Sequence, residues 1–242
     1  MMRLDIDVDF DFTTDHEYWK TYNKGHSESD PDTNSPKLRL YQQMLYSRQT
    51  PSGNALILEQ GKNKNDDYLV CDGVRYGSDS IINMYAYQLP EIEKEIENYE
   101  KKINEYIHKG YTIGGEIIFP KHKMSINQCR GINHSIKDRF DLTLECIRLF
   151  YEGKNNPLND VLTRDEEFFR LFVNFRGYVD FFLLNDLVSD DYKKVKLFLG
   201  ADVGMFNRNP LPQNKQEWEQ LLDNQMRFLE KRNKRIKRFC CK

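Results

Sequence analysis

Residues 125–151 read SINQCRGINHSIKDRFDLTLECIRLFY and place charged side chains in and beside a segment whose spacing is typical of a buried helix. From Phe140 onward, apolar residues recur every three or four positions and cover well over half of the helix circumference. We therefore expect a helix with Asp138 as its N-cap, which runs to about Glu152 and stops at Gly153. A helix this apolar needs packing partners on several sides, which predicts a central position in the fold.

The polar residues of this helix fall on one line along its surface. Asp141 and Glu145 are like charges one turn apart, an unfavourable arrangement unless a cation balances them. Arg148 is spaced to pair with Glu145. Arg139 lies only two positions before Asp141, so we expect it to point to a different side of the helix. The cation for Asp141 should then come from outside the helix, and the candidates are Arg130 and Arg176.

Two interpretations of these charges are open beside a third, a surface for a protein partner. One is a buried ion-pair network that locks the central helix to its neighbours, because buried charges are retained only when they are paired. The other is a polar site formed by the loop 127–133 and the helix N-terminus, where N–H groups and guanidinium groups favour a phosphate-bearing ligand such as a nucleotide. The predicted ligand-binding residues are Asn127, Gln128, Arg130, Asn133, Asp138, Arg139, Asp141 and Glu145.

The N-terminal stretch LDIDVDFDF, residues 4–12, alternates apolar and acidic residues with a strict period of two, which predicts a half-buried strand. Its acidic face is either solvated or binds a divalent cation, since hard cations prefer carboxylate oxygens. No histidine–carboxylate motif follows, and the five cysteines lack zinc-site spacing, so we predict no metal centre. The residues of the acidic face are Asp5, Asp7, Asp9 and Asp11.

Further elements follow from capping residues and periodicity. We expect a helix that begins at Pro36 after an N-cap at Ser35, and a short helix that starts at Ser78 or Asp79. Longer helices are expected at 91–110 and 214–239. Strands cluster before residue 120 and helices after it, a pattern typical of an α+β fold. We predict a single globular domain over 1–242, in which a strand-rich N-terminal half packs on a mainly helical C-terminal half, with a candidate subdomain seam at 120–125.

The composition bounds the class of protein. The 242 residues are 39% hydrophobic, 31% charged and 13% aromatic, with a mean hydropathy of −0.76. The high aromatic content favours a folded chain over a disordered one. No apolar run reaches the roughly 20 residues that span a bilayer, so no membrane partner is expected. The odd cysteine count, with adjacent Cys240 and Cys241, favours reduced thiols and a cytoplasmic location.

The C-terminus is basic although the chain as a whole has a net charge of −2. Seven of the last 12 residues are Lys or Arg. Such a helix end either binds nucleic acid by neutralising phosphates or complements the helix dipole. The low net charge weighs against nucleic acid as the partner without excluding it.

Six motifs carry a resemblance over almost the whole chain. In order they are DPDTNSPKLRLYQQMLYS, YGSDSI, YTIGGEIIFP, SINQCRG, DRFDLTLECIRLFY and FRGYVDFFLLNDLV. With them the chain resembles a family of uncharacterised bacterial proteins, whose members also occur in prophages. The resemblance favours one unit spanning both halves, and it implies no activity, cofactor or catalytic residue. It adds a further alternative, a non-enzymatic protein-interaction module used in phage–host conflict.

Overall fold

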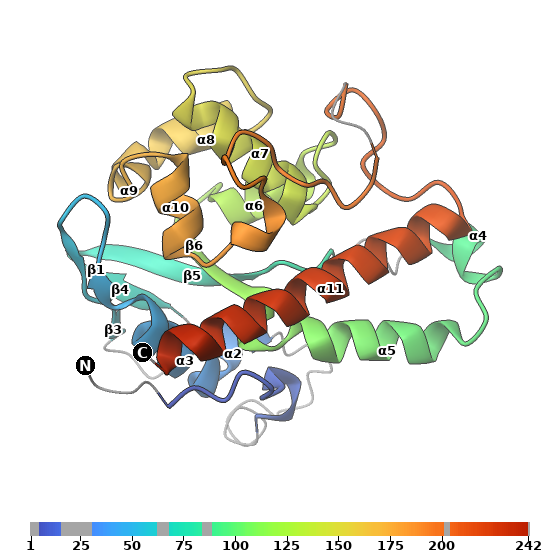
Figure 1. The fold of residues 1–242 in the computed structure, drawn as a ribbon, viewed down its shortest axis with the longest axis horizontal. Coiled ribbons are helices and arrows are strands. Elements are labelled where there is room, and N and C mark those ends of the chain that lie inside the picture. The colour runs from blue at the N-terminus through green and yellow to red at the C-terminus, as the bar shows by residue number, and fades with distance from the viewer. Residues whose placement is uncertain (1–4, 16–30, 62–67, 84–88, 201–203, 242) are drawn as a thin grey trace.

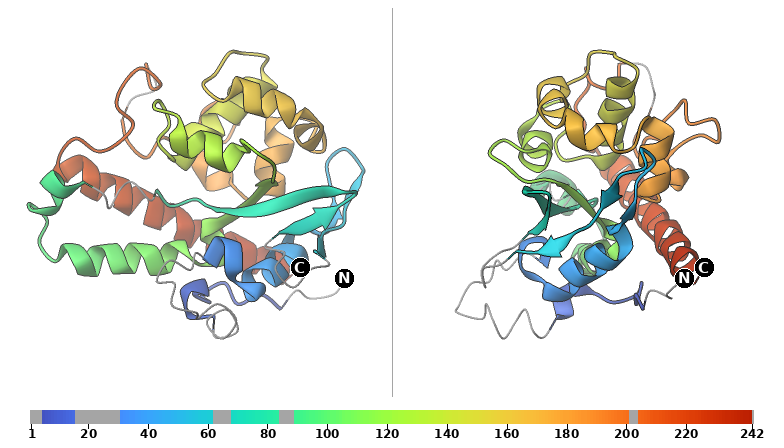
Figure 2. Two further views of the ribbon diagram at one scale, coloured as in Figure 1. Left: turned by 180° about the vertical axis from the view of Figure 1, so that it is seen from behind. Right: turned by 90° about the vertical axis from the view of Figure 1, so that its left-hand side faces the viewer.

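The computed structural model describes residues 5–15, 31–61, 68–83, 89–200 and 204–241. Within them the chain forms three layers, in which an antiparallel sheet lies between two layers of helices (Figures 1 and 2). The strands come from the N-terminal half and most of the helices from the C-terminal half. The predicted α+β class, with a strand-rich N-terminal half packed on a helical C-terminal half, is confirmed.

The main sheet has four antiparallel strands in the order β3-β4-β5-β6. Its longest pairing joins β5 to β6, with Tyr76 opposite Pro120 and Ser80 opposite Glu116. A separate two-stranded sheet pairs β1 with β2. The strands are β1 (Arg48–Gln49), β2 (Ala55–Leu56), β3 (Glu59–Gln60), β4 (Leu69–Cys71), β5 (Val74–Ser80) and β6 (Glu116–Pro120).

One helical layer, drawn above the sheet in Figure 1, follows β6 in the sequence and surrounds the helix predicted to be central. That helix, α7, has Phe140, Leu144 and Ile147 fully buried, and Gly153, at φ 66°, follows its end. The predicted central position is therefore confirmed. The layer contains α6 (Ile126–Ile132), α7 (Phe140–Tyr151), α8 (Asn159–Arg164), α9 (Glu166–Arg170) and α10 (Phe175–Phe181).

The other helical layer packs on the opposite face of the sheet, and its longest member runs along the whole molecule (Figure 1). This helix, α11, begins after Asn214, whose side chain accepts a hydrogen bond from the Glu217 amide at 2.9 Å. Its counterpart at the N-terminus, α3, begins at Pro36, and Ser35 Oγ accepts from the Leu38 amide at 3.1 Å. Both helices agree with their predictions. The layer contains α2 (Pro31–Asn34), α3 (Pro36–Tyr46), α5 (Tyr99–Gly110) and α11 (Lys215–Cys240).

Short elements connect these layers, and buried side chains from both halves of the chain belong to one contiguous hydrophobic cluster. A shared core is what a single unit requires, and the domain assignment itself stays a prediction. The short helices are η1 (Phe12–Thr14), α4 (Pro90–Glu93), η3 (Ile113–Gly115) and η4 (Asn185–Leu187).

The predicted N-terminal strand is wrong: residues 5–11 form no strand, and the 3-10 helix η1 follows. The Asp9 amide donates to Asp7 Oδ1 at 3.0 Å, and the Thr13 amide donates to Asp11 Oδ1 at 2.9 Å. These local bonds take up backbone groups that a strand would give to its neighbour. The aspartates that gave the alternating pattern thus also prevent a strand, because their carboxylates bond to nearby backbone amides.

Two helix predictions also fail. The short helix expected from Ser78 is instead part of β5, where Ser78 pairs with Ile118; its continuation into 84–88 lies outside the described residues. The helix expected at 91–110 is two helices, α4 and α5, and Asn98 between them has φ 55°. Pairing with a distant strand decides the first case, and a residue in the left-handed region interrupts the second.

Candidate functional site

Arg130 lies at the centre of the predicted polar site and is fully buried. Its Nη1 contacts Asp79 Oδ2 at 2.5 Å and donates to the Ser80 carbonyl at 2.9 Å, and its Nη2 donates to the Asp138 carbonyl at 2.6 Å. The Nε donates to Thr143 Oγ1 at 3.3 Å. The guanidinium group therefore joins β5, α6 and α7 through internal partners.

The charges around Arg130 favour its protonated form. Burial lowers the pKa of Arg130, but the carboxylates of Asp138 and Asp79 outweigh that effect and leave its pKa above the ordinary value. Burial raises the pKa of the Asp79 carboxyl, and the Arg130 guanidinium opposes the rise. Asp138 Oδ1 lies 3.2 Å from Arg130 Nη1. The cation thus faces two carboxylates.

Arg139 and Asp141 pair with each other, contrary to the expectation that Arg139 points to a different side of the helix. Arg139 Nε donates to Asp141 Oδ1 at 3.1 Å, and Nη2 donates to Oδ2. Arg139 precedes the first helical residue as the N-cap, so its backbone is extended and the helical two-residue rule does not apply. Asp141 Oδ2 also accepts from the Phe198 amide at 2.7 Å. The prediction that Asp141 needs a cation from Arg130 or Arg176 is therefore wrong.

The Glu145–Arg148 pair predicted within α7 is confirmed. Arg148 Nε and Nη2 donate to the two oxygens of Glu145, each at 2.7 Å, and Nη1 donates to Glu152. Glu145 is buried, whereas Glu152 is about one-third exposed. In the C-terminal half of α7, the acidic residues Glu145 and Glu152 are therefore balanced by Arg148 of the same helix.

The amide side chains of the predicted site bond to backbone groups. Asn127 Nδ2 donates to the Ser78 carbonyl at 2.9 Å, and Asn133 Nδ2 donates to the Pro157 carbonyl at 3.1 Å. Gln128 Oε1 accepts from the Met124 amide at 2.8 Å. These bonds close the turn before α6 and attach α6 to β5 and to the segment before α8.

The local structure around these residues differs from the prediction in two respects. The segment expected as a loop is the helix α6. Asp138 is not the N-cap of α7, because it has φ 64° and Arg139 takes that position. The backbone carbonyl of Asp138 accepts from Arg130 Nη2, eight residues earlier in the chain.

Of the eight predicted residues, the structure joins Arg130 to Asp138 and Arg139 to Asp141, and these charged groups already have internal partners. Among the described residues, no side-chain hydrogen bond or ion pair joins Asn127, Gln128, Asn133 or Glu145 to either pair. The arrangement fits the buried ion-pair network of the sequence interpretation. Sequence reasoning missed Asp79, Thr143 and the Phe198 amide. Asp79 carried a signal, an acidic residue beside the expected start of a helix. The Phe198 amide carried none, since every residue except proline has a backbone N–H. The role of these residues in binding a ligand stays a prediction.

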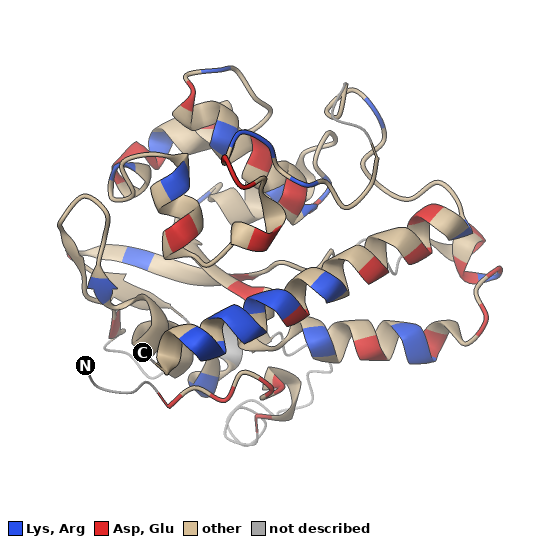
Figure 3. Ribbon diagram, in the orientation of Figure 1, with Lys and Arg blue, Asp and Glu red and all other residues tan. Residues whose placement is uncertain are grey.

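A second polar feature lies on the exposed side of α11. Arg227, Lys231, Lys234 and Arg238 follow one another at steps of four, three and four residues, so they form one stripe along the helix. All four are exposed, and they make no ion pair or side-chain hydrogen bond within the part of the chain that the structure describes. Figure 3 shows the basic bands along the C-terminal half of α11, with acidic bands toward its N-terminal half. We call these four residues the basic stripe.

Other cations of the same helix are engaged. Arg232 is buried and donates to the carbonyls of Gly114 and Glu116 at 2.8 and 2.9 Å. Arg235 pairs with Asp186 of η4 at 3.0 Å. The structure therefore separates the basic C-terminus into cations that hold the fold and cations that face solvent.

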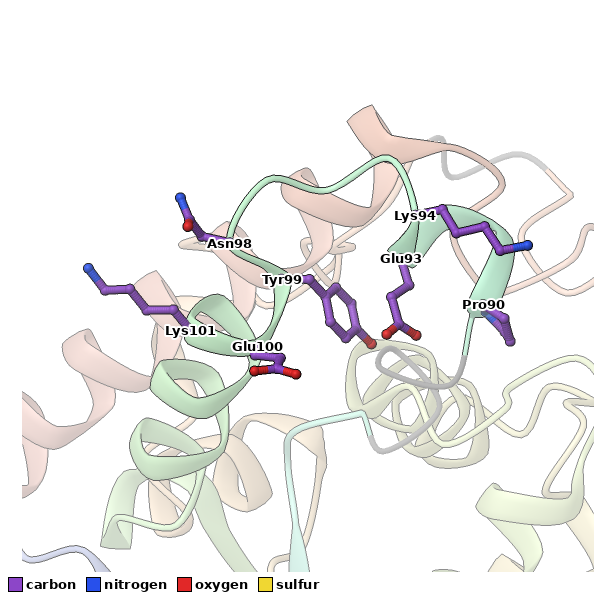
Figure 4. Close-up of a pocket in the computed structure, with 7 residues that line it drawn as sticks. All are labelled: Pro90, Glu93, Lys94, Asn98, Tyr99, Glu100 and Lys101. Atoms are coloured by element: carbon purple, nitrogen blue, oxygen red, sulfur yellow. The ribbon is translucent and has the colours of Figure 1, made fainter.

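An open hollow of about 660 Å³ lies at the turn between α4 and α5. Figure 4 shows the side chains of Glu93 and Tyr99 pointing toward each other, while those of Asn98 and Lys101 point away. Because its polar groups do not converge, this hollow offers no defined place for a ligand.

The N-terminal aspartates do not gather around one point. Asp11 contacts His108 Nδ1 at 2.6 Å, and Asp7 holds the Asp9 amide. Among the described residues, no three His, Cys, Asp or Glu side chains form a group suited to a metal ion. All five cysteines are free thiols. In the same described parts, no helix has the length and apolar character needed to cross a membrane.

Comparison with known proteins places the chain in a family without assigning an activity. No curated protein and no solved structure matches it significantly. A family model described as a family of unknown function, DUF6994, matches residues 6–236. The match covers the sheet, both helical layers and most of α11, and the chain therefore belongs to the DUF6994 family of unknown function.

Proposed function

We propose that this protein binds nucleic acid, a phosphate-bearing polymer, through the basic stripe on α11. The observation that supports the proposal is that Arg227, Lys231, Lys234 and Arg238 are exposed on one helix face with no internal counterion within the described residues. When exposed cations in a row neutralise phosphates, the counterions condensed on the nucleic acid are released. This release favours association without further contacts.

The helix dipole accounts for only part of this charge. Its influence is limited to about the last turn, which contains Arg238. Arg227 and Lys231 lie about three and a half and two and a half turns before the end of α11 at Cys240, where a cation gains little from the dipole. The stripe is thus longer than capping requires, and charge complementarity favours a polyanion.

The other sequence hypotheses stay predictions. A small phosphate-bearing ligand at α6 and α7 would have to compete with Asp79 and Asp141, which already hold Arg130 and Arg139. The interaction module in phage–host conflict, the bacterial and prophage origin and the cytoplasmic location gain no specific observation here. As in the first hypothesis, the proposed ligand carries phosphate. The cations that bind it are the exposed ones of the basic stripe and not the buried Arg130 and Arg139.

The test is fluorescence anisotropy with labelled DNA and RNA oligonucleotides. In the stripe variant, all four stripe residues are replaced by glutamine, and its affinity should fall by at least about tenfold. The matched control removes the same charge from exposed lysines elsewhere, and it should bind like the natural protein. The control substitutions are Lys94→Gln, Lys123→Gln, Lys154→Gln and Lys193→Gln.

Three outcomes would overturn the proposal. The first is that no oligonucleotide binds at near-physiological salt. The second is that both variants lose affinity equally, which would mean that only net charge matters. The third is that vesicles containing phosphatidylserine bind through the stripe while nucleic acids do not, which would identify a membrane surface as the partner.

A further inference from the structure

The basic stripe is straight and rigid. Its first and last cations are 11 residue steps apart, or about 17 Å of helix at 1.5 Å per step. The opposite side of α11 is fixed along its length, with Trp218, Phe228 and Ile236 buried. In the same region Asn233 Nδ2 donates to Thr112 Oγ1 at 2.8 Å. The backbone positions from which these charges project are therefore fixed in a straight row.

Over the span of the basic stripe, residues 227–238, α11 exposes no asparagine or glutamine side chain. Gln225 Nε2 donates to the Ile81 carbonyl, Asn224 Nδ2 donates to the Phe198 carbonyl, and Asn233 is buried. The amides of Asn224, Gln225 and Asn233 are thus all bonded within the protein. Base-edge recognition relies on exposed amides, which the stripe lacks, or on bidentate arginines that enter a groove, of which the stripe has only Arg227 and Arg238 at its two ends.

The helix also presents no aromatic platform. Trp218 and Phe228 are buried, and the half-buried ring of Phe239 is covered by the Arg48 guanidinium, 4.2 Å from the ring centroid. Proteins that hold single strands combine a basic groove with exposed rings on which bases stack. The exposed face of α11 has the charges of such a site without the rings.

We infer that the polymer bound by the basic stripe is a nucleic-acid duplex, held by its phosphates without sequence preference. This inference rests on the proposed function. A duplex carries one charge per about 1.7 Å of axis with both strands counted, and each phosphate contact contributes about −0.9 to the salt slope on a duplex against about −0.7 on a single strand. The same four cations therefore gain more from counterion release on a duplex. B-form DNA and A-form RNA share this chemistry, and the measurement separates them.

The experiment compares the full-length protein on four labelled ligands of about 20 nucleotides or base pairs. These are two DNA duplexes of unrelated sequence, one RNA duplex, and one single strand of the first DNA duplex. Anisotropy titrations from about 50 to 200 mM KCl give the dependence of log K on log salt. Four phosphate contacts predict a slope of about −3.6 on B-form DNA, and the double variant Lys231→Gln/Lys234→Gln should reduce it to about −1.8.

The two DNA duplexes should bind within about twofold of each other, and the single strand should bind at least about fivefold more weakly than its duplex. Tighter binding of the single strand, or a clear preference between the duplex sequences, would overturn the inference while leaving nucleic-acid binding intact. If the slope of log K against log salt is unchanged in the double variant, Lys231 and Lys234 do not contact phosphates, which would also overturn the inference. If no ligand binds at all, the proposed function itself fails. The variants should fold normally, since all replaced side chains are exposed. Circular dichroism melting checks this.

Discussion

Arg130 Nη1 and Asp79 Oδ2 lie 2.5 Å apart although 51 positions separate the two residues in the sequence. The contact joins β5 to α6, and the same guanidinium reaches Asp138 just before α7. The polar residues beside the central helix are therefore held by long-range partners. This relationship makes the stability of the fold depend on a few buried charges.

Replacing Arg130 by methionine should lower the free energy of unfolding by about 3–5 kcal/mol, because Asp79 and Asp138 would lose their buried cation. Urea unfolding monitored by fluorescence measures the change. Adding Asp79→Asn to Arg130→Met should recover part of the loss, since one uncompensated carboxylate is removed. If the two substitutions add without coupling, the two residues do not act as a pair.

Asp141→Asn should destabilise the protein by about 3–5 kcal/mol, since Arg139 would lose its buried partner. The Phe198 amide would also lose part of its acceptor. Glu152→Gln is the matched control in the same segment; its side chain is 37% exposed, so the cost should stay below about 1 kcal/mol. Equal costs for the two variants in urea unfolding would contradict the network described above.

Gly115→Ala should strongly destabilise the protein, because a Cβ at this position would lie 1.6 Å from the Gly110 carbonyl oxygen. Gly131 of α6 provides the control, since a Cβ there has no heavy atom within 4 Å. Gly131→Ala should instead stabilise the fold by about 0.5–1 kcal/mol, the gain expected for alanine within a helix. Thermal melting of both variants checks the opposite signs.

His122 should make the stability depend on pH. Its Nε2 contacts Asp165 Oδ1 at 2.8 Å and its Nδ1 contacts the Lys123 carbonyl at 2.9 Å. Burial lowers the pKa of His122, but these two hydrogen bonds outweigh it and raise the pKa above 6.5. Both ring nitrogens donate only when the ring is protonated, so the contribution is fully present below pH 6.5 and is lost as pH rises through the raised pKa. Strong acid also removes it, because Asp165 then becomes protonated.

Because the His122 side chain is 35% exposed, solvent screening limits this contribution to about 0.5–1 kcal/mol. The difference in unfolding free energy between the natural protein and His122→Asn should therefore shrink from about pH 6 to about pH 9. In an Asp165→Asn background most of this pH dependence should disappear. A difference that stays constant with pH in the natural background would show that the imidazolium contributes nothing.

The sequence by itself determined the elements whose signals are local. Helix α3 follows from Ser35 and Pro36, and α11 from Asn214 and a long apolar stripe, because caps and periodicity act within a few residues. The pair Glu145–Arg148 is of the same kind, since both residues lie on one helix within one turn. These features require no knowledge of distant parts of the chain.

Only the tertiary structure decided the elements and partners that depend on residues far away in the sequence. Residues 78–80 became a strand because β6 lies beside them, and residues 5–11 formed none because their aspartates bond to the local backbone. Arg130, predicted to bind a ligand, pairs instead with Asp79 of β5. Exposure separated buried Arg232 from exposed Lys231, although the two are adjacent in sequence. Sequence gives the charge of each residue, but whether that charge is buried, paired or open to a ligand depends on what the folded chain packs against it.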